Sequence, residues 1–363
     1  MDQLSQTLIT LVLLFSIFNF FTARSIKSTG VPIPESVALL IPMRNEIANA
    51  ESVLATAFAQ VQLDNFKVRV IDDGSTDGTH EVLRKVADRR FEFIHSNSLP
   101  DESLPEGWLG KNYALHQLAS KSSEEFLVFI DADVRLEKSA IADSIALLKK
   151  QGWDYISPYP RQIARAPLAK LVQPLLQWSW FASLPLRLIE RSKSKSTVVA
   201  NGQFFIVRNE SYQRAGGHNA IKGEVLDDME LARSLRRTGS IGSVVDGSKI
   251  AHCEMYQNSD SLIAGYSKSQ WRAFGGTLGA LVAICILFFS SIYPALSALR
   301  GETWGIYGYF ALSLSRLLVA ARTRSTIVSA PLHPIAIAVW IGLIIRSLVF
   351  KRSGQLQWRG RKI

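Results

Sequence analysis

Cysteine is scarce in this chain, and no cysteine spacing typical of a zinc site or a disulfide framework is present. The two cysteines among 363 residues, Cys253 and Cys285, lie far apart, and Cys285 sits inside an apolar run. A disulfide-stapled domain is therefore excluded, and a reducing compartment is favoured for the main domain. The sequence also lacks internal repeats, long low-complexity tracts and any recognisable nucleic-acid-binding motif, so we predict no nucleic-acid partner.

Positive charge and long apolar segments are what the chain has in quantity. Lys and Arg outnumber Asp and Glu by 41 to 31, which gives a net charge of +10, and 47% of the residues are hydrophobic. A basic protein can bind nucleic acid, a polyanionic substrate or a membrane surface. Because the apolar residues are gathered in blocks, the sequence favours the membrane.

The first apolar block, residues 7–23, carries no charge and is just long enough to cross a bilayer. It could instead be a signal peptide, but no basic residue precedes it, so we favour a retained anchor. A C-terminal membrane region of two or three helices is expected at 276–350, followed by a basic tail at 351–363. Its strong candidates are 276–299 and 334–350, whereas 304–321 either spans or lies in the interface, because Arg316 is well inside it.

The orientation of these segments is left open by the sequence. Basic residues follow the first anchor and also fill the C-terminal tail, and the positive-inside rule would place both in the cytoplasm. That arrangement needs an even number of C-terminal spans, whereas three spans would put the tail outside. We expect an integral membrane protein whose large middle domain is cytoplasmic.

Residues 36 to about 260 read as alternating strands and helices. Short apolar runs at 37–42, 66–72, 91–96 and 126–131 alternate with helical patterns at about 46–60, 78–89, 111–121 and 138–150. This alternation predicts an α/β domain with a parallel sheet and helices on both faces. Ligands of such sheets bind beyond the carboxyl ends of the strands, so the residues that follow each run are candidates for a site.

Polar, turn-forming clusters follow three of the runs: "PMRNE" (42–46), "DDGSTDGT" (72–79) and "DADV" (131–134). A capped turn accounts for much of the second cluster, but it does not explain two aspartates directly after a buried strand. Asp131 and Asp133 flank one small residue, and in extended backbone their side chains point to the same side. Two such carboxylates repel unless a cation lies between them, which predicts Mg²⁺ or Mn²⁺. The alternative is a polar loop with two solvated acids.

Together these motifs resemble family 2 glycosyltransferases of the GT-A fold. The resemblance covers about 36–275 and rests on "IPMRNE", "VIDDGSTDGT", "GWLGKNYAL", "FIDADVRL", "NGQFFIVRNESYQRAGGH" and "VLDDMELARSLRRTG", in the order typical of the family. It implies a GT-A domain with a mostly parallel sheet. It also implies a hexosyltransferase that uses a UDP- or GDP-sugar and Mg²⁺ or Mn²⁺ in an inverting displacement.

The resemblance assigns roles residue by residue. Asp131 and Asp133 match the metal-binding pair, and Asp228 matches the general base, with Asp227 beside it. A carboxylate at 228 could also serve as a helix-start acid that the helix dipole favours. The implied donor-binding residues are Pro42, Arg44, Asn45, Glu46, Asp72, Asp73, Gly110, Lys111 and Asp131, and the implied acceptor-side residues are Gly202, Gln203, Gln270, Trp271 and Arg272.

Two further features bear on this assignment. "SQWRAF" (269–274) looks like a reduced form of the family's Q-x-x-R-W segment, and that departure argues against a processive polysaccharide synthase. Some GT-A enzymes use a late histidine as a metal ligand, but for His252 we favour a structural or surface role.

The acceptor is expected to be soluble in lipid. The stretch 166–195, rich in Trp and Leu and broken by prolines, is either a membrane-interface element or packs against the protein's own core or membrane helices. The closest resemblance is to a subgroup that acts on isoprenoid lipids, which implies a carotenoid hydroxyl of the myxol or chlorobactene type. Alternatives are a polyprenyl-phosphate or other glycolipid glycosyltransferase, a processive polysaccharide synthase, and a membrane protein that binds a nucleotide without turnover.

Overall fold

The computed structural model describes residues 1–95, 104–192, 194–353, 357–358 and 361–362. The chain forms two compact units. The sheet unit comprises Arg24–Arg161 and Glu190–Cys253, and the helical unit comprises Met1–Ala23, Gln162–Ile189 and Glu254–Ile363. The units divide the chain differently from the expected 36–275 domain, because 162–189 and 254–275 belong to the helical unit.

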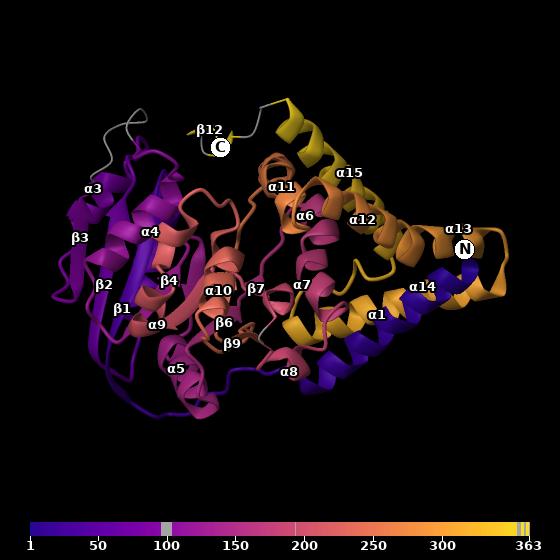
Figure 1. Ribbon diagram of the computed structural model, residues 1–363. Helices are drawn as coiled ribbons and strands as arrows, with labels where there is room; N and C mark the ends of the chain where they lie inside the picture. The colour runs from indigo at the N-terminus through magenta and orange to yellow at the C-terminus, as the bar shows by residue number, and fades with distance from the viewer. Residues whose placement is uncertain (96–103, 193, 354–356, 359–360, 363) are drawn as a thin grey trace. The chain divides into compact units, whose positions relative to one another are not determined.

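The sheet unit is built on a seven-stranded sheet with the order β3-β2-β1-β4-β8-β6-β9 (Figure 1). Four of its neighbouring pairs are parallel, and β8 runs antiparallel to both β4 and β6. The prediction of a mostly parallel sheet is confirmed. The strands of this unit are β1 (Ile33–Met43), β2 (Leu63–Asp72), β3 (Phe91–His95), β4 (Phe126–Ile130), β5 (Val134–Leu136), β6 (Tyr155–Tyr159), β8 (Phe204–Arg208), β9 (Gly242–Asp246) and β10 (Ala251–Cys253), and β7 (Arg161–Gln162) follows β6 where the chain leaves the unit.

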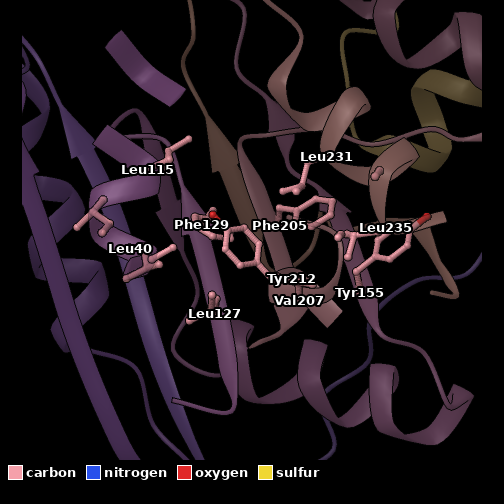
Figure 2. Close-up of a cluster of buried hydrophobic side chains, with 14 of the residues drawn as sticks. Leu40, Leu115, Leu127, Phe129, Tyr155, Phe205, Val207, Tyr212, Leu231 and Leu235 are labelled. Carbon is pink, nitrogen blue, oxygen red and sulfur yellow. The ribbon is translucent and has the colours of Figure 1, made fainter. Parts of the chain in front are cut away.

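The core of the sheet unit lies between the sheet and its helices. Central strands such as β4 are buried along their whole length, which explains why they read as continuous apolar runs. Figure 2 shows Leu40 and Leu127 of the strands, with Leu115 of α4 and Leu231 of α10, in one apolar cluster. Burying one such side chain contributes about 1.5–3 kcal/mol. The helices are α2 (Ile47–Phe58), α3 (Thr79–Arg84), α4 (Gly110–Ser120), α5 (Ala140–Gln151), α9 (Asn209–Arg214) and α10 (Asp227–Arg237), with the short 3₁₀ turns η1 (Lys195–Thr197) and η2 (Gly217–Ile221).

The third helix is shorter than expected, since the helical pattern predicted 78–89 and α3 ends at Arg84. The Asp88 side chain accepts hydrogen bonds from the backbone N–H of Arg90 (2.8 Å) and from its guanidinium. Local side-chain bonds of this kind compete with the helical ladder, so this stretch forms a turn before β3.

Among the residues that the structure describes, the helical unit contains four helices that are long and apolar enough to cross a membrane: Asp2–Thr22, Thr277–Leu299, Thr303–Thr323 and His333–Arg352. The segment 304–321 therefore belongs to one continuous helix. The elements are α1 (Asp2–Thr22), α6 (Pro167–Val172), α7 (Pro174–Phe181), α8 (Leu186–Ile189), α11 (Ser259–Ala273), α12 (Thr277–Leu287), the π-helical turn η3 (Phe288–Ile292), α13 (Tyr293–Leu299), α14 (Thr303–Thr323), α15 (His333–Arg352), β11 (Gln357–Trp358) and β12 (Arg361–Lys362).

Arg316, the central charge of α14, is 1% exposed. Its guanidinium donates hydrogen bonds to the carbonyl oxygen of Leu171 at the end of α6 and to the hydroxyl of Ser329. In the next helix, α7, the Trp178 indole N–H donates to Ser315 Oγ at 2.9 Å. Most of the stretch 166–181 thus packs within the helical unit, whereas Leu188 on α8 is 71% exposed.

Candidate active site

One lysine lies between two carboxylates at the carboxyl end of β4. Lys111, the second residue of α4, places Nζ 2.9 Å from Asp131 Oδ1 and 3.3 Å from Asp227 Oδ2. Burial favours the neutral amine, but the charges of the two aspartates outweigh it and raise the pKa of Lys111. Lys111 is therefore a cation at neutral pH, and it joins the residue after β4 to the first residue of α10.

Asp228, the next residue of α10, is held by two backbone donors. Its Oδ2 accepts the N–H of Gly202 (2.8 Å), and its Oδ1 accepts the N–H of Met229 (2.7 Å). Gly202 permits this approach, because a Cβ at that position would lie 3.2 Å from Cβ of Asp228. Burial and the charge of Asp227 raise the pKa of Asp228 to about 6, while Lys111 and the two N–H groups act against them. A carboxylate with this pKa suits proton abstraction near neutral pH.

Asp133 places one carboxyl oxygen in a buried position beside other acidic side chains. Within the described residues, its Oδ1 is buried and has no hydrogen-bond partner. Burial, then the charges of Asp131 and Glu46, raise the pKa of Asp133 to about 7, and the thiol of Cys253 lies against the same carboxyl. An oxygen buried without a partner beside other acids fits a divalent cation. The contact with Cys253 was not predicted, because β10 is far away in the sequence.

No group of three His, Cys, Asp or Glu side chains arranged to hold a metal occurs among the described residues. Two carboxylates alone fit a Mg²⁺-type site, in which substrate phosphates and water complete the coordination. His252 is exposed on β10 between two buried neighbours, which agrees with the surface role favoured above.

The loops after β1 and β2 are joined by side-chain hydrogen bonds. The backbone N–H of Asn45 donates to Ser75 Oγ (2.9 Å), and Asn45 Oδ1 accepts the N–H of Thr76 (2.8 Å). Asn45 has a φ of 53°, a left-handed conformation that asparagine tolerates better than most residues. The N–H of Ile47 donates to Asp77 Oδ2 at 3.0 Å. The predicted clusters at 42–46 and 72–79 are therefore hydrogen-bonded to each other at the end of the sheet.

The two aspartates after β2 differ in their surroundings. Asp72 Oδ1 accepts from the N–H and hydroxyl of Ser75, and its Oδ2 lies 3.1 Å from His80 Nδ1. Through these contacts Asp72 caps the loop after β2, and a donor-binding role for it stays a prediction. Asp73 is 2% exposed, and its carbonyl oxygen accepts a hydrogen bond from Arg44 Nη1 at 2.7 Å.

Asn112 fixes the start of α4 and was missed by the sequence reasoning. Its Nδ2 donates to the carbonyl oxygens of Ile221, Lys222 and Glu224 at 2.9–3.2 Å. The N–H of Leu109 also donates to the Lys222 carbonyl at 2.9 Å. Together these bonds hold Gly110 and Lys111 beside the loop that precedes α10. The signal in the sequence was an asparagine within the helical pattern of "GKNYAL".

A small pocket in the sheet unit brings the lysine and three of these aspartates together. Its polar lining is Lys111, Asp131, Gly202, His218, Asp227 and Asp228, and its remaining lining is apolar. The predicted Gln203 contributes through its carbonyl oxygen, which accepts the N–H of Asp131 at 3.3 Å. His218 ends the motif "AGGH", for which no role was predicted.

Three predicted acceptor-side residues lie on α11 in the helical unit. Gln270 Oε1 accepts from the Trp340 indole N–H at 2.8 Å, and the N–H of Trp271 donates to Ser347 Oγ at 3.1 Å. Arg272 lies 5.8 Å from the Trp271 ring centroid. These contacts tie α11 to α15, and an acceptor-side role for these residues stays a prediction.

Comparison with known proteins gives concordant matches. Residues 38–216 match the family described as Glycosyl transferase family 2. The chain is 24% identical over 275 residues to the 4,4'-diaponeurosporenoate glycosyltransferase of Staphylococcus haemolyticus (strain JCSC1435), covering 73% of this chain and 69% of that protein. It is 24% identical over 348 residues to the protein of the same name from Staphylococcus aureus (strain USA300), covering 90% and 88%.

Among solved structures, the chain is similar to a mannosyltransferase from Pyrobaculum calidifontis in complex with GDP-Man and Mn²⁺. The TM-score is 0.57 with 18% identity, covering 97% of this chain and 98% of that one. The sheet order and this likeness define a GT-A fold. The protein is a glycosyltransferase, and its residues 38–216 are similar to the glycosyl transferase family 2 domain.

Proposed function

We propose that the protein transfers a sugar from a UDP- or GDP-sugar to an oxygen of a lipid-soluble acceptor, a carotenoid. The observation that carries the proposal is the pocket in which Asp228, oriented by two N–H donors, lies beside the Lys111–Asp131 pair. This pocket offers both a base and a cation. Those are the two groups that a sugar transfer from a diphosphate requires.

The proposed reaction is a single displacement. Asp228 removes the proton of the acceptor hydroxyl, and the acceptor oxygen forms a bond to the anomeric carbon. The bond between that carbon and the phosphate oxygen breaks, and the nucleoside diphosphate leaves with the bonding electrons. Lys111 stabilises the negative charge that develops on the leaving group. Asp131 and Asp133 would hold a divalent cation, which when bound neutralises the diphosphate.

Support for a carotenoid acceptor comes from the relatives, whose printed name is 4,4'-diaponeurosporenoate glycosyltransferase. The suffix of that name denotes a carboxylate, whereas our sequence prediction was a hydroxyl of the myxol or chlorobactene type. The relatives thus favour a second candidate acceptor, a carotenoid carboxylate. A carboxylate is already ionised at neutral pH and has no proton for Asp228 to remove.

A lipid-soluble acceptor agrees with the helical unit. Four helices of the described part of the chain are long and apolar enough to cross a membrane, and we propose an integral membrane protein with its sheet unit in the cytoplasm, where nucleotide-sugars are made. Labelling lysines from each side of sealed vesicles tests this orientation: the exposed lysines of the sheet unit, such as Lys121 and Lys150, should react only from the cytoplasmic side.

The decisive experiment supplies purified protein with labelled UDP-glucose or GDP-mannose, Mn²⁺, and either a hydroxylated carotenoid or 4,4'-diaponeurosporenoate. A labelled pigment glycoside that survives mild base identifies a hydroxyl acceptor, and one that mild base cleaves identifies an ester. An acid-labile labelled phospholipid, formed from membrane extract in place of a pigment product, would show the polyprenyl-phosphate alternative. In the native host, deletion should remove a pigment glycoside and accumulate its aglycone.

A further inference from the structure

The motif "AGGH" ends in a histidine that lies in the pocket. His218 is 2% exposed and lines the pocket with Asp227 and Asp228. Its ring packs edge-on against Phe129, with centroids 5.1 Å apart. A buried histidine at this place either fills space or presents one nitrogen to a substrate, and its hydrogen bonds decide between these roles.

Both hydrogen bonds of His218 among the described residues run to the hydroxyl of Tyr212. The backbone N–H of His218 donates to Tyr212 Oη at 3.0 Å, and Tyr212 Oη lies 2.8 Å from His218 Nδ1. The Tyr212 oxygen therefore accepts one proton from the backbone, and its own proton points to the ring nitrogen. Buried hydroxyl protons are almost always bonded, so Nδ1 is an acceptor and the ring proton resides on Nε2.

Burial also keeps this imidazole neutral. It lowers the pKa of His218 to about 3, against the opposing charge of Asp227 and together with the charges of Lys111 and His116. The ring thus carries one N–H in one fixed tautomer across the physiological pH range. The Nε2–H of His218 is a neutral donor with a fixed position, whereas the charged ammonium of Lys111 suits phosphate oxygens.

The double glycine makes this pairing sterically feasible. Gly217 has a φ of 51°, and a Cβ at that position would lie 2.5 Å from the Tyr212 ring. Because no side chain larger than hydrogen fits there, Tyr212 reaches the residue that follows the glycines. Tyr212 is itself 2% exposed and packs in the apolar cluster beside Phe129 (Figure 2).

We propose that His218 is a specificity-determining residue whose Nε2–H donates a hydrogen bond to a hydroxyl oxygen of the sugar being transferred. This inference rests on the proposed function. The diphosphate takes the charged groups, and the acceptor contributes the oxygen that reacts. The sugar hydroxyls are the neutral oxygens left to be recognised, and a neutral donor binds them without attracting free phosphate. Tyr212 acts as the positioning residue that sets the tautomer.

The test compares binding of a nucleotide with and without its sugar. Full-length protein in detergent with Mn²⁺ is titrated calorimetrically with UDP, UDP-glucose, GDP and GDP-mannose. For His218→Phe, which keeps a ring but removes the donor, we expect nucleotide affinity to stay unchanged. The affinity of the better nucleotide-sugar, relative to its nucleotide, should fall about 3- to 10-fold, which corresponds to one hydrogen bond between neutral groups.

Matched variants separate binding from packing. His218→Gln retains an N–H near Nε2 and should recover most of the loss. Tyr212→Phe should weaken sugar binding in the same direction, and the double variant should show no further loss, because both act through one bond. His116→Phe is the control, since His116 packs against Trp108 and does not line the pocket.

Three outcomes would overturn the inference. The first is a His218→Phe variant in which the affinity of the nucleotide-sugar relative to its nucleotide is unchanged. The second is an equal loss of affinity for nucleotide and nucleotide-sugar, which indicates a structural role. If His218→Phe does not fold, wild-type protein is titrated with monodeoxy analogues of the bound sugar, and equal affinity for all of them would refute it. Failure of the wild-type protein to bind any nucleotide or nucleotide-sugar would instead refute the proposed function.

Discussion

Replacing Lys111 with methionine isolates the electrostatic centre of the site. Lys111 Nζ bonds to Asp131 at 2.9 Å and to Asp227 at 3.3 Å, and the lysine and these partners have side-chain exposures of 23%, 29% and 14%. Methionine preserves the length of the apolar stem, so the change removes the charge with little loss of packing. Two carboxylates then remain close together, beside Asp228, with no cation between them.

Removing one partner of a buried ion pair costs about 3–5 kcal/mol, and we take about 3 kcal/mol because these side chains are partly exposed. For a unit of this size, that corresponds to a fall in melting temperature of about 6–12 °C. Because the pKa of Lys111 is raised in the fold, its contribution to stability should be full below about pH 10, where lysine is protonated in the unfolded chain. The deficit of Lys111→Met should therefore be constant at lower pH and shrink as the pH rises above about 10.

Thermal unfolding of the detergent-solubilised protein, followed by tryptophan fluorescence with and without Mn²⁺, measures this effect. Mn²⁺ should stabilise Lys111→Met more than the wild type, because the ion meets no competing ammonium; at about 100 times Kd it would restore about 2.7 kcal/mol. Lys121→Met is the matched control, an exposed lysine just past the end of the same helix, and should change little. A Lys111→Met variant that melts within about 1 °C of the wild type would refute the reasoning, since even 1 kcal/mol corresponds to about 2–4 °C.

Three further predictions concern the acids and the double glycine. Asp133→Asn should abolish Mn²⁺-dependent donor binding in calorimetry. In the wild type, Asp133 with its pKa of about 7 stays protonated in the fold but ionises near pH 4 in the unfolded chain, so the wild type loses stability as the pH rises from about 4 to 7. Asp133→Asn should remove this loss. Donor binding that persists in chelator would contradict the metal assignment. Asp228→Asn should lower kcat about 10²- to 10⁴-fold with a hydroxyl acceptor and eliminate the acidic limb of activity near pH 6, whereas near-normal turnover would point to a carboxylate acceptor or another base. Gly217→Ala should lower the melting temperature measurably, since its Cβ would lie 2.5 Å from the Tyr212 ring; an unchanged melting temperature would contradict the close packing.

The local patterns of the sequence determined the first half of the sheet unit. Apolar runs placed β1, β2, β3 and β4 within a few residues, because strands buried on both faces leave a continuous apolar signal. The polar clusters after these strands could also be predicted as one site, because parallel strands end at the same edge of the sheet. Strands β6, β8 and β9 were not among the predicted runs, and their pairing with one another and with β4 is seen only in the structure.

Only the tertiary structure decided how the chemical groups meet. Asp131 and Asp133 could be identified from their spacing, but the bridge from Lys111 to Asp227, the N–H of Gly202 on Asp228 and the support of α4 by Asn112 join distant segments. Burial, which sets the pKa values of these carboxyls, is a property of the packed molecule. A sequence pattern identifies the side chains that can carry a charge or a proton. Folding sets the distances between them and their desolvation, and these decide which side chains are charged and which are protonated.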